Sequence, residues 1–374
     1  MVPLKRHHFF SIFRHQNTLM AFFKIILSIF SVLVLLTVLI PFIKKDFWMF
    51  RVFDYPRLQK FTIIGIVGVL WLVFFPETEI ILDIVLMASL GISFLYLGYL
   101  ILPFTPFGKK MIGEVKKTEG KTCLNLLVAN IYQHNTNYQK LLNLVEKRNP
   151  DVVFLLETDK KWLEGVKSLR ENYPYHIEIP KENTYGLLFY SKIPIKHQEI
   201  NYLIDEEIPS IIADVEFDTE MVRIYGLHPT PPVPQENPHS TDRDAEILMI
   251  GKMAKEYDKP CLVIGDLNDV AWSYTTKLFL KSSELLDPRR GRGMYSTFHA
   301  KYKLLRWPLD HYFVSSHFRL VDMKVEDHID SDHFPISICL FISHEDDENK
   351  MTANAEEKEL VEEKIEAGIN EEPL

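Results

Sequence analysis

Three long apolar stretches in the first part of the chain constrain its fold more than any other feature. Ile25 to Ile43 and Phe61 to Phe75 contain no charged residue, and Ile80 to Leu102 contains only Asp83. A helix that crosses a bilayer needs about 20 apolar residues. The stretches therefore predict three transmembrane helices, at about 21–43, 59–76 and 80–102.

Two other structures could explain apolar stretches of this kind. The first is the buried core of a soluble protein, but three uncharged stretches within about 80 residues exceed what core helices need. The second is a cleaved signal peptide, but the first stretch is too long, and no pair of small residues precedes Lys44 as a cleavage site. We therefore expect an N-terminal flank over 1–20 and a membrane domain over 21–105, with the lipid bilayer as a partner.

Basic residues beside the stretches bear on orientation. With three spans, the N-terminus lies on the opposite side of the membrane from the C-terminal domain. The N-terminal flank and the second loop offer four basic residues, whereas the first loop and the segment after the third stretch offer nine. This count favours a cytoplasmic C-terminal domain in a multi-pass protein of a bacterial inner membrane. A different number of spans would reverse the side, which the sequence leaves open.

The acidity of the chain is confined to its end. The formal net charge is −9, and residues 344–374 contain 12 acidic residues, three lysines and no aromatic residue. Runs of like charge with few apolar groups are typical of solvated extensions. We therefore expect an acidic disordered tail over 344–374 and a domain of neutral net charge before it.

The three cysteines of the chain are Cys123, Cys261 and Cys339. They lie far apart in the sequence and are odd in number. On that basis we exclude a disulfide framework and a cysteine zinc site.

After a linker over 106–120, residues 121–343 consist of short apolar runs separated by turn residues. Such runs predict strands, and they are Leu124–Ala129, Val152–Leu156, Leu187–Tyr190, Ile211–Phe217, Val222–Leu227, Cys261–Ile264, Leu309–Val314 and Ile336–Phe341. Helical patterns intervene at Tyr138–Lys147 and Asp244–Tyr257. Several strands are apolar on both faces, as in sheets covered on both sides. The fold class is therefore α/β, with a sheet core flanked by helices.

Polar residues follow these strands at the points where the strands end. They are Asn130, Glu157, His228, Asp266, Asn268 and Asp310, with Asp332 and His333 in a late turn. Each one alone has an ordinary role as a turn or capping residue. Together they indicate one rim of a sheet where carboxylates, amides and imidazoles gather.

This set of side chains favours metal-assisted hydrolysis of phosphoesters. The chain lacks a glycine-rich nucleotide loop, a nucleophile elbow and the spacing of a zinc site. Carboxylate and amide oxygens suit Mg²⁺ or Mn²⁺. Two histidines could complement the charge on a phosphoryl group. An aspartate with an asparagine two residues later could orient a water molecule and accept its proton.

Two short motifs then carry a family resemblance. Gly265–Asn268 matches GDxN and Ser331–Pro335 matches SDHxP. From Lys121 to Phe341 the chain resembles the endonuclease/exonuclease/phosphatase superfamily, which includes deoxyribonuclease I-like phosphoesterases. Three spans before such a domain are similar to a bacterial membrane-bound branch that includes VanJ-type proteins. The resemblance implies a four-layer α/β sandwich with the site on one rim.

The resemblance also implies which residues bind metal. Glu157 would be the principal ligand of Mg²⁺, with Mn²⁺ as a possible substitute. Asn130 would assist it, and Asp332 would add a carboxylate on the metal side.

The remaining roles implied by the resemblance are catalytic. Asp266 would align or deprotonate the attacking water, and Asn268 would hold that water and the phosphate. His228 and His333 would bind the non-bridging oxygens. Asp310 would orient His333 and raise the pKa of its imidazole.

The sequence leaves the substrate open. Six basic residues lie near the motifs, Arg289, Arg290, Arg292, Lys301, Lys303 and Arg306. They could line a nucleic-acid groove or belong to a solvated loop. Thr158-Asp159 and Thr297-Phe298 depart from the pattern of many relatives in regions that contact substrate.

We therefore expect a membrane-anchored, Mg²⁺-dependent phosphoesterase, similar to a nuclease or phosphodiesterase, that hydrolyses phosphodiester or phosphomonoester bonds by metal-assisted attack of water. Its substrate would be a phosphate ester, namely a nucleic acid, a nucleotide or a lipid phosphate. One alternative is a phosphatase of lipid-linked phosphates such as prenyl pyrophosphate, and another is a non-catalytic membrane adaptor that retains the fold. No obligate protein partner is implied.

Overall fold

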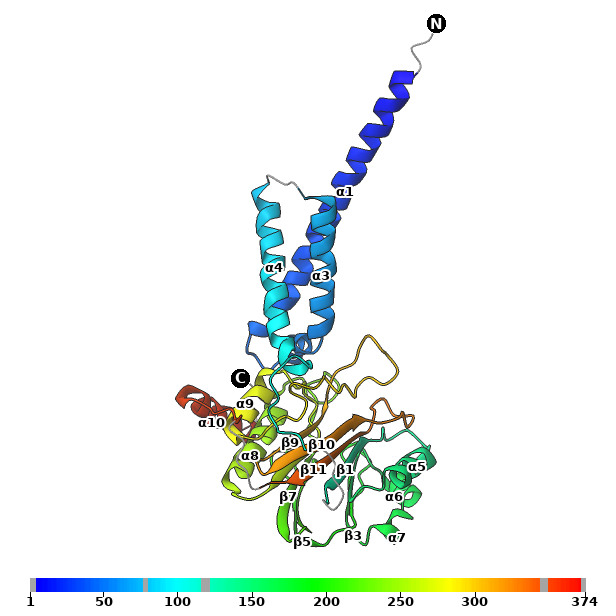
Figure 1. Cartoon of the computed structure of the whole chain (residues 1–374), viewed down its shortest axis with the longest axis vertical. Coiled ribbons are helices and arrows are strands. Elements are labelled where there is room, and N and C mark those ends of the chain that lie inside the picture. The colour runs from blue at the N-terminus through cyan, green and yellow to red at the C-terminus, as the bar shows by residue number, and fades with distance from the viewer. Residues whose placement is uncertain (1–4, 77–79, 116–121, 344–348, 371–374) are drawn as a thin grey trace. The chain divides into compact units, whose positions relative to one another are not determined.

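The computed structural model describes the whole chain except residues 1–4, 77–79, 116–121, 344–348 and 371–374 (Figure 1). These residues divide into two compact units. The first unit contains residues 1–44 and 56–101, and the second contains residues 45–55 and 102–374. We call the second one the catalytic unit, because it contains the residues that the sequence predicts to catalyse hydrolysis.

Three apolar helices make up the first unit, and they are α1 (Lys5–Leu39), α3 (Arg57–Phe74) and α4 (Ile81–Ile101). A short 3₁₀ turn, Ile40–Phe42, extends α1. Each helix contains a window long and apolar enough to cross a membrane, and about a fifth of each window is buried. The three predicted apolar helices are therefore confirmed, and their insertion in a bilayer remains a prediction.

Two mixed sheets form the centre of the catalytic unit. The first has the strand order β10 (Phe318–Val325), β11 (Ile336–Ile342), β1 (Leu124–Asn130), β2 (Val152–Leu156), β4 (Leu187–Ser191) and β3 (Tyr175–Ile179). The second has the order β5 (Ile195–Asn201), β6 (Ser210–Phe217), β7 (Glu220–Leu227), β8 (Cys261–Asp266) and β9 (Asp310–Val314).

The central strands are apolar on both faces because both faces are covered. Val128 and Phe154 of the first sheet and Ile264 of the second lie in one core between the sheets. Their neighbours along each strand, such as Leu155 and Val263, face outward into helix-covered clusters. This alternation confirms the predicted four-layer α/β sandwich.

Six helices form the outer layers. On the first sheet these are α5 (Tyr138–Arg148), α6 (Lys160–Gly165) and α7 (Leu169–Asn172). On the second sheet they are α8 (Thr241–Glu256), α9 (Tyr274–Ser283) and α10 (Ala355–Ile369). The segment 45–55 adds α2 (Trp48–Arg51) and a 3₁₀ turn, Val52–Asp54, and Leu102–Phe104 forms another 3₁₀ turn.

The pairing of the strands places the site. β1 runs parallel to β2, with Asn130 opposite Leu156, and β7 runs parallel to β8, with Leu227 opposite Gly265. Parallel strands end at the same edge of a sheet. The residues at the ends of β1 and β2 therefore lie at one edge of the first sheet, and those at the ends of β7 and β8 lie at one edge of the second sheet. We call these two edges the rim. β9 starts at this rim, where Asp310 pairs with Asp266.

The acidic tail is not the disordered segment expected from its charge. Over 355–369 it forms α10, which begins with a capping box between Asn354 and Glu357. Val361 and Ile365 are buried against the α8 side of the second sheet. The prediction was wrong here because the acidic residues are spaced by a narrow apolar stripe, which the overall charge conceals. Residues 344–348 and 371–374 lie outside the described part of the chain.

The domain boundaries also differ from those expected. In the predicted linker, Ile112 is fully buried in the core between the sheets, and Gly113 and Val115 exchange backbone hydrogen bonds with Leu320 of β10. Residues 45–55 were assigned to the membrane domain and instead belong to the catalytic unit. There, Trp48 N donates to Pro238 O at 2.8 Å.

The exclusion of a disulfide was wrong. Cys123 and Cys339 are bonded, with their Cα atoms 5.8 Å apart, although 216 residues separate them in sequence. The bond is possible because β1 and β11 are neighbouring strands. Cys261 is a buried free thiol.

Candidate active site

Asn130 and Glu157, the first two predicted metal ligands, are bonded to each other at the ends of β1 and β2. Asn130 Nδ2 donates to Glu157 Oε1 at 2.7 Å and to Asp266 Oδ2 at 3.1 Å. The backbone N–H of Gln133 donates to Glu157 Oε2 at 3.2 Å. Burial raises the pKa of the Glu157 carboxyl, and the nearby His228 imidazole and the Asn130 hydrogen bond partly offset this rise. A cation beside this carboxylate would relieve the same penalty.

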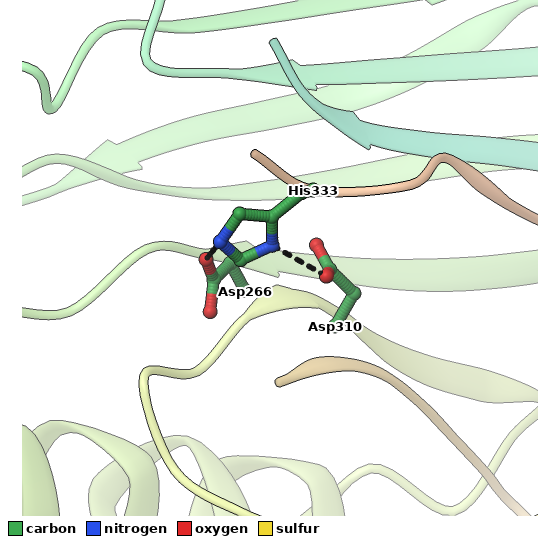
Figure 2. A group of neighbouring side chains, drawn as sticks. All are labelled: Asp266, Asp310 and His333. Carbon is green, nitrogen blue, oxygen red and sulfur yellow. Dashed lines mark hydrogen bonds and ion pairs between the residues drawn. The ribbon is translucent and has the colours of Figure 1, made fainter. Parts of the chain in front are cut away.

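Asp266, Asp310 and His333 form a second group of contacts (Figure 2). His333 Nδ1 lies 2.8 Å from Asp310 Oδ2, and His333 Nε2 lies 3.4 Å from Asp266 Oδ2. All three residues are buried, and one ligand atom from each lies within 4.8 Å of the others. This spacing is close enough to hold a metal ion.

Charge within this group determines the protonation of His333. Burial disfavours the imidazolium, but the carboxylates of Asp310 and Asp266 outweigh burial and raise the pKa of His333 to about 10. Burial also raises the pKa of Asp310, against the influence of His333. His333 is therefore a cation at neutral pH, with Nδ1 engaged by Asp310 and Nε2 directed at Asp266.

His228 and Asn268 complete the rim beside Asp266. His228 Nε2 lies 4.0 Å from Asp266 Oδ2, and its Nδ1 is buried with no hydrogen-bond partner among the described residues. Asn268 N donates to Asp266 Oδ1 at 2.9 Å, and Asn268 Nδ2 donates to Pro229 O at 2.9 Å. The first bond holds the Asp266 carboxylate against the turn that follows β8, and the second holds the Asn268 side chain in place.

Asp332 lies in the same turn as His333 but is less tightly held. Ser331 Oγ approaches its Oδ1 at 3.4 Å. Burial dominates the pKa of Glu157, and the Asp332 carboxylate adds a small upward contribution. The structure therefore brings all eight predicted residues to one rim, with Asp332 at its margin.

Unusual backbone geometry accompanies these residues. Glu157 and Asn268 have φ values of 62° and 49°, in the left-handed region that residues other than glycine seldom adopt. Gly265 has φ 138°, and a Cβ at this position would lie 2.0 Å from Leu227 O. The glycine of the GDxN motif is therefore required by the close approach of β8 to β7.

Several supporting residues were not predicted. Ser331 Oγ donates to Asn130 O at 2.8 Å and accepts from His333 N at 3.0 Å, so it ties the end of β1 to the histidine turn. Thr297 Oγ1 accepts from Asp310 N at 3.3 Å. Ser331 is the first residue of the SDHxP motif, so its hydroxyl was an available signal, whereas Thr297 lies outside both motifs.

Two side chains hold the backbone of Asn268. Tyr55 Oη donates to Asn268 O at 2.9 Å, and Arg243 Nη1 donates to the same oxygen at 2.8 Å. Tyr55 is 213 residues away in sequence. Nothing in the local sequence around Tyr55 indicates this contact.

Aromatic rings flank both histidines. The Tyr185 ring lies 5.4 Å from that of His228, and the Phe298 ring lies 4.9 Å from that of His333. Such rings limit the access of water and strengthen the electrostatic interactions of the imidazoles.

Most of the basic residues near the motifs are engaged internally. Arg289 is fully buried and binds Asp287 and the His311 ring. Arg292 pairs with Glu114 and is 7% exposed, and the Arg290 guanidinium lies over the Phe104 ring. Among the six, only the two lysines, 301 and 303, are exposed.

A comparison with protein-family models decides the classification. The model described as the Endonuclease/Exonuclease/phosphatase family matches residues 127–333, which is more than half of the chain.

The chain belongs to the endonuclease/exonuclease/phosphatase family.

Two solved structures of D. rerio TDP2 agree on the fold. TDP2 of D. rerio complexed with single strand DNA product is 17% identical, with a TM-score of 0.51 over 58% of this chain and 98% of that chain. A humanized D. rerio TDP2 with 14 mutations gives the same identity and coverage and a TM-score of 0.50. A family member from Beutenbergia cavernae is 16% identical, with a TM-score of 0.48 over 60% of this chain and 72% of that chain. No curated protein matches the chain.

These findings confirm the family, the deoxyribonuclease I-like α/β fold and the enzyme class, which is that of divalent-metal-dependent phosphoester hydrolases. All eight predicted site residues fall within the matched range. The likeness to the VanJ-type branch remains a prediction.

Proposed function

We propose that this protein is a membrane-anchored, Mg²⁺-dependent phosphoesterase. The observation that carries the proposal is a continuous chain of contacts from Glu157 through Asn130 and Asp266 to His333 and Asp310. It joins a buried oxygen-rich group to an imidazolium on one rim. This combination suits a phosphate ester, which needs its negative charge neutralised while a water molecule is activated.

Glu157 and Asn130 are the metal ligands we propose, with Asp332 on the same side. The donor set fits Mg²⁺, because the carboxylates of Glu157 and Asp266 are hard oxygen donors that approach the same Asn130 Nδ2 group. Asn130 would bind the ion through its Oδ1, which accepts from Tyr132 N at 3.1 Å in the structure. Bound there, a divalent cation would stabilise the charge that develops on the phosphoryl oxygens. Asp266, Asp310 and His333 also lie close enough to hold an ion. We assign them to catalysis because Asp310 and Asp266 outweigh burial and raise the pKa of His333 to about 10, and a protonated imidazole has no lone pair with which to bind a metal ion.

The roles of the catalytic residues follow from their contacts. Asp266 is fixed by Asn130 and Asn268 and can accept the proton of an attacking water. His333 is positively charged at neutral pH and can donate from Nε2 to a non-bridging phosphate oxygen. His228 Nε2 faces the same carboxylate from the other side and can act as a second donor.

A phosphate attached to a lipid is the substrate class that the surface favours over nucleic acid. Binding to nucleic acid depends on basic side chains that reach backbone phosphates. Three of the six nearby basic residues, Arg289, Arg290 and Arg292, are instead paired or packed inside the protein. The apolar helices of the first unit would keep the site at a bilayer. Prenyl pyrophosphate is one such substrate.

The disulfide supports a location on the oxidising side of the membrane. Disulfides form and persist outside the reducing cytosol. The bond between Cys123 and Cys339 links two strands of the catalytic unit. It therefore argues for an extracytoplasmic catalytic unit, against the side that the count of basic residues favours.

Phosphate release by the purified full chain tests the proposed function. We expect hydrolysis in Mg²⁺ that EDTA abolishes, with a lipid pyrophosphate in detergent preferred over DNA. DNA is the appropriate comparison because the structurally similar D. rerio TDP2 was solved with a single strand DNA product. Cleavage of DNA with steep salt dependence, and no action on the lipid, would instead establish a nuclease.

His333→Ala and Asp266→Ala should each lower the rate by at least about 100-fold while the circular dichroism spectrum stays unchanged. Unchanged turnover in either variant would refute the mechanism. A folded wild-type protein that hydrolyses none of the phosphoesters would favour the adaptor alternative.

A further inference from the structure

The loop from His299 to Arg306, which we call the rim loop, exposes apolar side chains beside the active site. Tyr302 is 57% exposed, Leu304 is 83% exposed and Leu305 is 48% exposed. Lys301 and Lys303 alternate with them and are exposed as well. In Figure 1 the loop is the dark gold segment that precedes β9. Several large apolar groups exposed together mark an interaction surface.

Backbone hydrogen bonds fix the shape of the rim loop. His299 N donates to Leu305 O and Leu305 N donates to Tyr302 O, both at 3.0 Å. Arg306 Nη2 donates to Ala300 O at 2.8 Å. These hydrogen bonds hold the exposed apolar side chains of the tip on an ordered turn. Because the turn is already ordered, little conformational entropy is lost when a partner binds it.

The base of the rim loop is attached to the catalytic residues. Ala300 N donates to Asp332 O at 2.6 Å. Phe298, just before the loop, packs its ring against His333, and the Arg306 guanidinium lies 4.7 Å from the Phe334 ring centroid. A surface that binds the apolar side chains of the rim loop would therefore lie close to His333, the histidine proposed to bind phosphate.

Other contacts within the catalytic unit indicate which kind of surface the rim loop binds. Trp307, just after the loop, has its ring 5.7 Å from that of Tyr55, and Phe104 lies in the same apolar cluster. Tyr55 precedes the first residue of α3 by two positions, and Phe104 follows the last residue of α4 by three. The rim loop thus lies next to the two points where the chain continues into helices that can cross a membrane.

The side chains of the tip suit the headgroup layer of a bilayer. Tyrosine and leucine bury apolar surface at the boundary of the acyl chains, and lysines extend to headgroup phosphates. Each basic residue near an anionic membrane surface adds electrostatic attraction. A nucleic acid would use the two lysines but would leave Leu304 in water.

We propose that the rim loop inserts its apolar tip into the headgroup layer of an anionic bilayer and holds the active site at that surface. The proposal rests on the membrane-anchored phosphoesterase activity proposed above. A lipid phosphate would then reach His333 while its hydrocarbon tail stays in the bilayer.

An environment-sensitive fluorophore tests the insertion directly. The full chain carrying Leu304→Cys is labelled with a nitrobenzoxadiazole probe and reconstituted into vesicles of phosphatidylcholine with phosphatidylglycerol as the minor component. Labelling is selective because Cys261 is buried and the other two cysteines are bonded. We expect a blue-shifted emission that lipids with a spin label on the acyl chain quench.

The control is Ile200→Cys on β5, at the opposite edge of the second sheet from β9, where the native side chain is 46% exposed. This probe should emit as in water and resist quenching. Equal behaviour of the two probes would overturn the proposal. So would shielding of position 304 that requires added DNA, which would assign the loop to nucleic acid.

A second experiment separates the loop from the chemistry. Leu304→Ser should lower turnover of a lipid pyrophosphate in the same vesicles about tenfold, since it removes one buried leucine from the interface. Hydrolysis of a short, water-soluble phosphoester should not change. An equal loss on both substrates would overturn the proposal. If the wild-type protein hydrolyses neither substrate, the proposed function fails, and the fluorescence result still decides whether the loop inserts.

Discussion

At the scale of single residues, the site depends on which groups carry charge in the folded protein. His333 is buried, yet its pKa rises to about 10 because two aspartates face it. Glu157 is buried without a cationic side chain bonded to it among the described residues, and its pKa also rises. The protein thus supplies a fixed positive charge on one side and a carboxylate suited to a metal ion on the other.

Asp310→Asn should move the alkaline limb of the pH–rate profile to lower pH. Asp310 bonds His333 Nδ1 at 2.8 Å and raises the pKa of the imidazole. Without that carboxylate, His333 loses its proton at lower pH, so activity should begin to fall below the pH at which it falls in the wild type. We also expect a loss of about 100-fold at neutral pH. A profile of kcat against pH checks this, and an unchanged alkaline limb would contradict the assigned role.

Glu246→Gln should stabilise the protein at alkaline pH. Glu246 is buried in α8 with Oε1 lacking a partner among the described residues, and burial raises its pKa to about 8, with Asp205 and Asp242 adding to the rise. The folded state therefore holds a proton that the unfolded state releases near its ordinary pKa of 4.5. The stability that this proton provides is complete below pH 4.5 and is lost as the pH rises to about 8.

Melting temperatures of the full chain in detergent measure this effect. Glu246→Gln should melt several degrees above the wild type at about pH 9 and show a smaller difference at about pH 5, at roughly 2–4 °C for each kcal/mol. Glu256→Gln, at the exposed end of the same helix, is the control. A gain of equal size at both pH values would show that Glu246 is not the titrating group.

The residues proposed for the site are easier to recognise in the sequence than the residues that hold them in place. Asp266, Asn268 and His333 lie in short motifs, because their local turns need those residue types next to one another. Tyr55 and Arg243 bond Asn268 from distant segments. Such contacts depend on tertiary packing, and no local pattern records them.

At the scale of elements, strands buried on both faces were predicted closely, whereas the edge strands β3, β5 and β10 were missed. β2 matches its predicted range, Val152–Leu156. β5 has mostly exposed side chains at the edge of its sheet, so its sequence, Ile-Lys-His-Gln-Glu-Ile-Asn, carries no continuous apolar run. The hydrophobic pattern reports burial, and an element with little burial gives little signal.

The helix α10 shows how one buried charge can hold an acidic segment in place. Lys364 Nζ lies 3.0 Å from Asp46 Oδ1 and 3.1 Å from Asp244 Oδ2, and all three side chains are nearly inaccessible. Lys364 therefore joins the C-terminal helix to both the segment 45–55 and α8.

Lys364→Met should destabilise the protein by about 3–5 kcal/mol, because it removes the cation from two buried carboxylates, leaving Asp46 with the Thr241 hydroxyl and Asp244 with Arg243. Thermal melting of the full chain in detergent measures the change. The control is Lys252→Met, which breaks the pair with Glu362 between the same two helices at an exposed position. That variant should cost at most about 1 kcal/mol. Equal effects of the two substitutions would contradict the role of the buried pair.

At the scale of the whole molecule, the amino-acid composition predicted that the apolar helices and the catalytic unit are separate. It did not predict that residues 45–55 belong to the catalytic unit. Residues 45–55 were assigned to the membrane domain because they lie between the first two apolar stretches. In the structure Asp46 is fully buried and bonded to Thr241 and Lys364. The boundary depends on these long-range partners, which the sequence does not display.

The side of the membrane that the catalytic unit occupies is a testable consequence of the disulfide. We expect a cysteine introduced at Ile200 to react with a membrane-impermeant maleimide in intact cells. Native thiols should stay unlabelled without reductant, since Cys261 is buried and Cys123 is bonded to Cys339. Labelling only after the cells are lysed would place the unit in the cytosol, as the count of basic residues favours.

The central claim is that eight side chains from separate strand ends surround one divalent cation and a phosphate ester. Anomalous diffraction from crystals of the full chain soaked in Mn²⁺ tests this claim most directly, because Mn²⁺ takes the oxygen ligands that suit Mg²⁺. We predict a strong peak bonded to the Glu157 carboxylate at the rim, which Glu157→Gln weakens or removes. Well-diffracting crystals with no peak at this rim, or with a peak that Glu157→Gln leaves unchanged, would contradict it.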